Sequence, residues 1–134
     1  KERQYQAATD LYSAMGIARE DKAGRNEQFM QNFRFFGAPH VAFIFLPEPF
    51  GLREAADCGM YAQSLMLALT AEGLASCPQT ALSFNADLVR EVLGIGAENK
   101  LLFGISFGEE DTDAAVNNCR TQRDTSDNCL RFFS

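Results

Sequence analysis

The sequence predicts a mixed fold, α/β or α+β, in which helices cover a small sheet. Helical periods alternate with short apolar runs that are typical of strands, and no linker, repeat or low-complexity tract interrupts them. The length of 134 residues, of which 46% are hydrophobic, is enough for one compact domain with its own core. We therefore expect a single domain over residues 1–134.

The N-terminal part of the chain predicts two amphipathic helices. Apolar residues recur at steps of three and four over residues 1–19, which indicates a helix with one buried face. A second helix is expected over residues 26–36, and Gly37 can end it as a C-cap. Its apolar face, which we expect in the core, consists of Phe29, Met30, Phe33 and Phe36.

Two apolar runs predict buried strands. Residues 41–46 are branched or aromatic and apolar on both faces, which is typical of a central strand. Residues 100–107 predict a second buried strand. Two shorter extended pieces are expected, one over residues 74–77 that ends at Pro78 and one over residues 130–133.

Residues 52–70 predict a long helix with apolar or small side chains almost all the way round. Such a helix is either buried on every side or lies in a subunit interface, and we expect an intimate homodimer with this helix near the two-fold axis. A shorter helix is expected between Asn85, which can cap its N-terminus, and Gly94. The side chains of this shorter helix that should face inward are Leu88, Val89, Val92 and Leu93.

Composition and spacing exclude several classes of protein. The 12 Lys and Arg against 18 Asp and Glu give a net charge of −6, which argues against a nucleic-acid partner because such binding needs clustered cations. The longest apolar stretch is interrupted by polar residues and falls short of a membrane span. The four cysteines form no C-x-x-C pair, which excludes a zinc knuckle and a thioredoxin-like motif. Their even number would permit two disulfides, but a chain that is 46% hydrophobic does not need them, so we expect reduced thiols in a cytoplasmic protein.

The candidate residues for chemistry are few. His40 is the one histidine of the sequence, which excludes histidine triads and multi-histidine metal sites and favours a structural role. The acidic residues 109–113 lack the spacing of an EF-hand, so a solvated turn is favoured and no metal site is expected. Cys77 has no basic neighbour in the sequence that would lower the pKa of its thiol. An enzyme with this composition needs a cofactor to carry its reaction.

Five motifs occur along the chain in a recognisable order. Together they resemble the FMN-dependent nitroreductase family: G-I-A-R-E-D from Gly16, N-F-R-F-F-G-A-P from Asn32, D-C-G-M from Asp57, G-L-A-S-C-P-Q from Gly73 and N-C-R-T-Q-R from Asn118. The resemblance covers nearly the whole chain but only the later part of a family domain, so we expect the N-terminal part of that domain to be missing. It implies an α+β, nitroreductase-like fold, in which a small mixed sheet is flanked by helices around a long buried central helix.

The resemblance also implies where a flavin would bind. The family's segment after the long helix runs beside the flavin ring, with backbone N–H groups near the reactive N5 edge. The residues that it places along the isoalloxazine are Cys77, Pro78, Gln79 and Thr80. The R-T-x-R segment of the family contacts the FMN phosphate and corresponds to Arg120 and Arg123. Guanidinium groups suit this role because their fork of donors binds a phosphate bidentately.

By the same resemblance, the chain is expected to be an FMN-dependent NAD(P)H oxidoreductase. Reduced nicotinamide, NADH or NADPH, would pass a hydride to FMN, and a nitroaromatic, a quinone or a similar acceptor would take the electrons, with no side chain acting as acid or base. An alternative of a different class is a non-catalytic remnant, or a homodimer module that binds flavin without turnover. Because the family's arginine-rich N-terminal motif has no counterpart here, FMN binding is expected to be weak. Residues 130–133 are expected to add a strand to the sheet of a partner subunit.

Overall fold

The computed structural model describes residues 2–133, which fall into two compact units. The terminal unit is formed by the described residues up to Asn26 together with those from Asp111 onward. The sheet unit contains Glu27–Glu110. The expectation of one domain over the whole chain stays a prediction.

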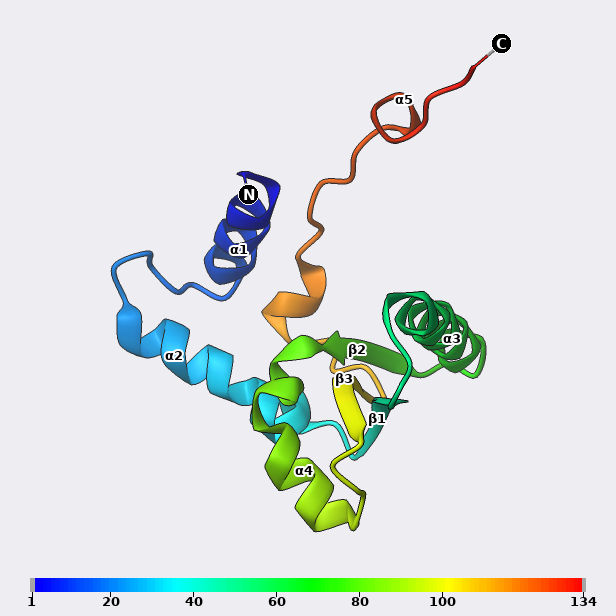
Figure 1. The fold of residues 1–134 in the computed structure, drawn as a ribbon. Coiled ribbons are helices and arrows are strands. Elements are labelled where there is room, and N and C mark those ends of the chain that lie inside the picture. The colour runs from blue at the N-terminus through cyan, green and yellow to red at the C-terminus, as the bar shows by residue number, and fades with distance from the viewer. Residues whose placement is uncertain (1, 134) are drawn as a thin grey trace. The chain divides into compact units, whose positions relative to one another are not determined.

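A three-stranded sheet forms the centre of the sheet unit (Figure 1). Its strands are β1 (His40–Pro47), β2 (Ala75–Gln79) and β3 (Asn99–Gly108), and they lie in the order β1-β3-β2. Both pairings are antiparallel, so the described sheet is not mixed. Both predicted strands are present. β3 is central and half of its residues are buried, whereas β1 lies at an edge and only its Leu46 is buried. The central position expected for residues 41–46 is wrong, because an edge strand of a sheet covered on both faces is as apolar as a central one.

Strand β2 continues through Pro78, where the sequence predicted that the extended piece would end. Proline cannot donate a backbone hydrogen bond, and sheets tolerate it on edge strands. Among the described strands β2 pairs with β3 alone, with Pro78 opposite Ile105, so β2 has such an open edge. The strand therefore reaches Gln79 before the chain turns.

Helix α3 (Leu52–Ala71) has nearly the predicted bounds. The Glu54 carboxylate accepts a hydrogen bond from the Gly51 N–H at 2.9 Å, which caps the first turn and lowers the pKa of the Glu54 carboxyl. The helix contacts all three strands. Ala62 lies on its packed face with only 3% of its surface exposed.

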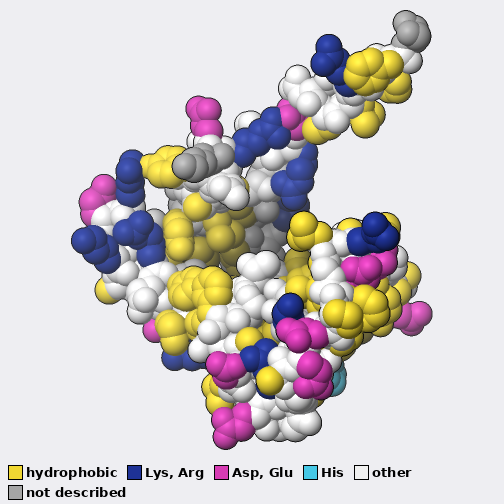
Figure 2. Space-filling model, viewed as in Figure 1, with side chains coloured by type: hydrophobic (Ala, Val, Ile, Leu, Met, Phe, Trp, Pro, Cys, Tyr) yellow, Lys and Arg dark blue, Asp and Glu magenta, His cyan; other side chains and the backbone are white. Residues whose placement is uncertain are grey.

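The opposite face of α3 is apolar and open. Met60, Tyr61 and Leu67 are 64%, 63% and 62% exposed, and Figure 2 shows hydrophobic side chains gathered on the surface of this helix. The helix is therefore not buried on every side within the chain, which corrects the first of the two sequence alternatives. The second alternative, a subunit interface, stays a prediction.

The helix predicted over residues 26–36 is divided in the structure. Helix α2 (Lys22–Met30) begins earlier, and the 3₁₀ helix η1 (Gln31–Gly37) follows it. Within η1, Phe35 and Phe36 have φ angles of 55° and 53°, a left-handed conformation that costs free energy for a residue with a Cβ atom. Gly37, with φ of 78°, ends the segment as expected.

The phenylalanine-rich stripe is core only in part. The ring of Phe29 packs edge-on against Phe33, with 5.8 Å between ring centroids, and stacks on Phe84 at 6.5 Å. Phe29 and Phe36 nevertheless remain 40% and 44% exposed. Met30 is also 40% exposed, although it lies with Phe29 in the regular helix α2. The expectation that this stripe is core is therefore wrong for part of it.

A second 3₁₀ helix, η2 (Thr80–Asn85), leads into helix α4 (Ala86–Leu93). Gly94 ends α4 in the left-handed conformation as predicted, whereas the Asn85 side chain makes no capping hydrogen bond. The inward face predicted for α4 is wrong, because this helix packs mainly on η2 rather than on the sheet. The side chains that it leaves open are Leu88, Val92 and Leu93, at 59%, 75% and 49% exposure.

The terminal unit contains α1 (Glu2–Ala14), the 3₁₀ helix η3 (Ala115–Asn118) and the short helix α5 (Ser126–Cys129), and α1 contacts η3. Helix α1 ends well before residue 19, because Gly16 takes φ of 69° and the Ile17 N–H donates to the Tyr12 carbonyl at 2.9 Å. Lys1, part of the predicted helix, lies outside the described residues. Residues 130–133 belong to no strand, and their addition to a partner's sheet stays a prediction.

In the described part of the chain, none of the helices combines the length and the hydropathy that a membrane crossing requires.

Candidate functional site

The segment predicted to face the flavin ring is anchored by Gln79 in the sheet unit. The Gln79 side chain is 3% exposed. Its amide nitrogen donates to the Asn32 carbonyl oxygen at 3.0 Å and to the Asn32 side-chain oxygen at 3.3 Å. Its amide oxygen accepts a hydrogen bond from the hydroxyl of Ser106, which is 2% exposed. The side chain predicted to contact the ring is therefore fully engaged inside the sheet unit.

The neighbours of Gln79 are open instead. Cys77, Pro78 and Thr80 are all exposed, so these residues are open to a ligand. Desolvation raises the pKa of the Cys77 thiol, which keeps it protonated at neutral pH and makes it a poor nucleophile. The exposed part of the segment carries no charge at neutral pH.

A close approach of η2 to the sheet fixes the path of the chain after Gln79. Gly104 on β3 lies opposite Gln79, and a Cβ atom on Gly104 would come within 2.5 Å of the Leu82 side chain of η2. A larger residue at position 104 would require the Leu82 side chain to shift. Leu82 is accordingly buried, with 4% of its surface exposed.

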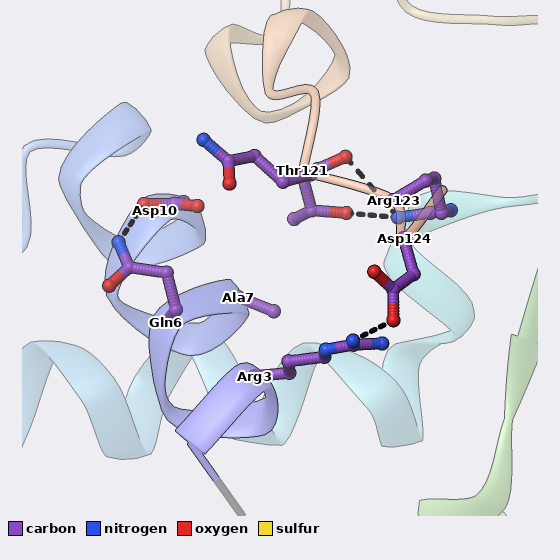
Figure 3. Close-up of a pocket in the computed structure, with 8 residues that line it drawn as sticks. Arg3, Gln6, Ala7, Asp10, Thr121, Arg123 and Asp124 are labelled. Carbon is purple, nitrogen blue, oxygen red and sulfur yellow. Dashed lines mark hydrogen bonds and ion pairs between the residues drawn. The ribbon is translucent and has the colours of Figure 1, made fainter. Parts of the chain in front are cut away.

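The terminal unit places Arg123 in a cavity of about 150 Å³ (Figure 3). Arg123 donates to the Thr121 hydroxyl and to the Thr121 carbonyl oxygen at 3.3 Å. Arg3, on α1, reaches into the same cavity and forms an ion pair with Asp124. The remaining residues that line it are Gln6, Ala7, Asp10, Thr121 and Gln122.

The two predicted phosphate ligands differ in their surroundings. Within residues 2–133 neither Arg120 nor Arg123 makes an ion pair. Arg120 donates to the carbonyl oxygens of Asn117 and Cys119 and does not line the cavity. Arg123 has only neutral partners in a cavity, so its charge is available to an anion. Of the two, Arg123 is the better placed.

Sequence reasoning missed Arg3, Asp124, Asn32 and Ser106. The Arg3–Asp124 pair spans a separation of 121 residues, and Asn32 and Gln79 are 47 residues apart, so no local pattern could connect them. The Q of the G-L-A-S-C-P-Q motif was a signal for Gln79, but it could not distinguish a buried amide from a ligand contact.

His40 and the cysteines are the remaining candidates for chemistry. The His40 ring stacks on Phe107 with 5.3 Å between centroids, which fits a structural role. Cys58, Cys77, Cys119 and Cys129 are free thiols. Between residues 2 and 133 no group of histidine, cysteine and carboxylate side chains could hold a metal ion.

A second cavity, of about 360 Å³, lies in the sheet unit between β1 and α3. Tyr61 from the open face of α3 and Cys58 contribute to its wall, together with Ile44, Phe45 and Asp57. It holds no cluster of groups suited to acid–base chemistry.

Comparison with known proteins decides the family. The model of the nitroreductase family matches residues 1–109 of this sequence. The chain belongs to the nitroreductase family. The α+β nitroreductase-like fold expected from the motifs is confirmed by the solved structures of relatives.

Two relatives illustrate the similarity. Nitroreductase NfnB of Mycolicibacterium smegmatis is 48% identical over 132 residues, which is 98% of this chain and 56% of the relative. A 4-nitrobenzoate reductase of Pseudomonas putida is 32% identical over 135 residues, which is 99% of this chain and 59% of the relative. The chain thus spans somewhat more than half the length of the nitroreductases that it matches.

Two solved structures have nearly the same backbone. The FMN-dependent nitroreductase NfnB from Mycobacterium smegmatis, in complex with NADPH, gives a TM-score of 0.95 at 48% identity, over 99% of this chain and 60% of that one. The FMN and NADPH-dependent NfnB from Sphigopyxis sp. strain HMH gives 0.96 at 40% identity, with the same coverage.

Proposed function

We propose that this chain belongs to an FMN-dependent oxidoreductase that takes electrons from NADPH and reduces a nitroaromatic acceptor. The observation that carries the proposal is the match to two structures of FMN- and NADPH-dependent nitroreductases, at 48% and 40% identity, over 99% of the chain. These relatives favour NADPH over NADH. Relatives described as nitrobenzoate, chloronitrobenzene and nitrobenzene reductases favour a substituted nitrobenzene over a quinone.

The sheet unit supports the ring-binding part of this proposal. Three of the residues 77–80 are exposed and uncharged. The fourth, Gln79, is fixed by hydrogen bonds to Asn32 and Ser106. When bound, FMN supplies the chemistry, because it accepts a hydride and passes electrons to a second substrate. We propose that Cys77, Pro78, Thr80 and the backbone of Gln79 lie along the isoalloxazine and orient it.

The terminal unit supports the phosphate-binding part. Arg123 has no carboxylate partner in the described chain and lines a cavity, so it is suited to an anion. Arg120 retains guanidinium N–H groups beyond its two carbonyl contacts and is proposed as the second phosphate ligand. The nearby Asp124 carboxylate is engaged by Arg3, which reduces its repulsion of a phosphate.

Flavin binding and turnover test the proposal together. We expect the chain to quench FMN fluorescence on titration, and the loaded protein to oxidise NADPH when 4-nitrobenzoate or nitrobenzene is added. FMN binding without NADPH oxidation would favour the flavin-binding module instead. The absence of quenching at protein concentrations up to about 100 μM would contradict the proposal.

We also propose a homodimer formed through the open face of α3. Met60 and Leu67 are seven residues apart, so they lie on the same side of the helix. An apolar helix face that the chain itself leaves more than 60% exposed is typical of an interface. Ala62 points to the sheet, so only substitutions on the open face separate assembly from folding.

A cytoplasmic location is proposed as well, because Cys58, Cys77, Cys119 and Cys129 are free thiols in the structure. Free cysteines persist where thiols are kept reduced. Cell fractionation of the tagged protein tests it, and recovery of a disulfide-bonded form from an oxidising compartment would contradict it.

A further inference from the structure

Every polar atom of the Gln79 side chain is hydrogen-bonded inside the sheet unit. The amide nitrogen makes two hydrogen bonds to Asn32, at 3.0 and 3.3 Å, and the amide oxygen receives the Ser106 hydroxyl. Gln79 and Ser106 are 3% and 2% exposed. A buried polar group is costly unless it is fully paired, so this network has a single well-defined arrangement.

The network joins three elements at one residue. Asn32 belongs to η1, Gln79 is the last residue of β2, and Ser106 belongs to the central strand β3. Gln79 is also the residue from which η2 begins, so the direction of the chain at Thr80 depends on it. The three residues therefore fix the point at which the exposed segment leaves the sheet.

The η1 side of this network carries a strained backbone. Phe35 and Phe36 both have φ near 55°, which is unfavourable for residues other than glycine. Such a conformation persists only where tertiary contacts hold it. The hydrogen bonds from Gln79 to Asn32 and the packing of Phe35 on Phe43, with 6.3 Å between ring centroids, are contacts of this kind.

We propose that Gln79 is a positioning residue for the flavin, which acts through Asn32 and Ser106 rather than by side-chain contact with the ring. The buried amide fixes the end of β2 and the start of η2, so that the exposed residues Cys77, Pro78 and Thr80 keep fixed positions beside the isoalloxazine. This inference rests on the proposed function. It assigns a role to Asn32 and Ser106, which lie in other segments of the sequence.

The test uses two variants and one matched control. Gln79→Met keeps the volume of the side chain but removes its hydrogen bonds, and Ser106→Ala removes only the bond to β3. The control is Gln4→Met, because Gln4 is an exposed glutamine on α1 in the terminal unit. Far-ultraviolet circular dichroism and thermal unfolding first show that each variant is folded. Ser106→Ala remains informative if Gln79→Met fails to fold.

The first measurement does not need flavin. Amide hydrogen exchange in the flavin-free chain should become about tenfold faster over residues 77–82 in Gln79→Met, and less so in Ser106→Ala, while residues 52–71 of α3 stay unchanged. A tenfold change corresponds to about one net hydrogen bond. Unchanged exchange over residues 77–82 in both variants would overturn the proposal.

The second measurement uses the FMN-loaded protein. The visible circular dichroism of the bound flavin should change, and kcat with NADPH should fall about tenfold or more while the KM for NADPH changes little, because the ring is misplaced rather than released. Faster exchange with an unchanged flavin spectrum and kcat would show that the network is merely structural. Failure of the unsubstituted chain to bind FMN would instead overturn the proposed function, while the exchange measurement still reports on the network.

Discussion

The two units that carry proposed FMN ligands are built in opposite ways. In the sheet unit, Gln79 and Ser106 are 3% and 2% exposed and form neutral hydrogen bonds. In the terminal unit, the Arg3 side chain is 73% exposed, and its ion pair with Asp124 lines a cavity. Buried neutral bonds fix geometry and are insensitive to salt, whereas exposed charges supply attraction that salt weakens. The first region is suited to positioning a ring and the second to attracting a phosphate.

The largest effect is expected from the core behind the first region. Ile105 is completely buried on β3, so Ile105→Ala should lower the free energy of unfolding by roughly 2–5 kcal/mol. Leu52→Ala is the control, because Leu52 is 93% exposed and should change stability by less than about 0.5 kcal/mol. Urea unfolding measures both. Equal effects at the two positions would contradict the description of this core.

The open face of α3 should control assembly rather than folding. Met60→Asp together with Leu67→Asp places two charges on the exposed apolar face, so sedimentation should show a monomer that keeps its helical content. Leu88→Asp, an equivalent change on α4, should leave the dimer intact.

Deletion from residue 128 onward should weaken the dimer if the tail adds a strand to the partner. A monomeric unsubstituted chain at micromolar concentration would contradict the dimer proposal.

Arg123 should act on the phosphate alone. Arg123→Ala should weaken FMN binding by roughly 10- to 150-fold, since a hydrogen bond to a charged group contributes about 1.5–3 kcal/mol. Riboflavin has the same ring without the phosphate, and its affinity should not change. Arg19→Ala, an exposed arginine of the terminal unit that lies over Tyr5, serves as the control. An equal loss of riboflavin affinity would show that Arg123 contacts the ring or supports the fold rather than binding the phosphate.

The smallest effect is expected at the Arg3–Asp124 pair. Because Arg3 is largely exposed, Arg3→Ala should lower stability by only about 0.2–1 kcal/mol at low salt, and the difference should vanish near 1 M salt. Unfolding of Arg3→Ala, Asp124→Asn and the double variant at two salt concentrations measures the coupling. A coupling that persists in high salt would show that this region is buried like the Gln79 network.

Sequence reasoning predicted the elements that local patterns encode. The strands over residues 41–46 and 100–107, the long helix and the stops at Gly37 and Gly94 all follow from periodicity and glycine positions, and all are confirmed. The order of the strands was not predictable, because β1 is apolar on both faces although it lies at an edge. The open face of α4 was also missed, since its pattern is that of a packed helix.

The candidate site was predictable only where family motifs exist. The motifs led to residues 77–80, Arg120 and Arg123, whose contacts with FMN stay predictions. They could not show that the Gln79 side chain turns into the sheet, because its partners Asn32 and Ser106 are 47 and 27 residues away. Nor could they predict the left-handed Phe35 and Phe36, which local preference disfavours and tertiary contacts maintain.

Reduction of the bound flavin by NADPH tests the central claim most directly. FMN is mixed with an excess of the chain, so that most of the flavin is bound, and NADPH is added in the absence of oxygen while the visible absorbance of the flavin is followed. The account predicts that this absorbance is bleached by NADPH and restored by a stoichiometric amount of 4-nitrobenzoate or nitrobenzene. Bound flavin that NADPH does not bleach, or flavin that the chain binds no better than an unrelated protein does, would contradict it.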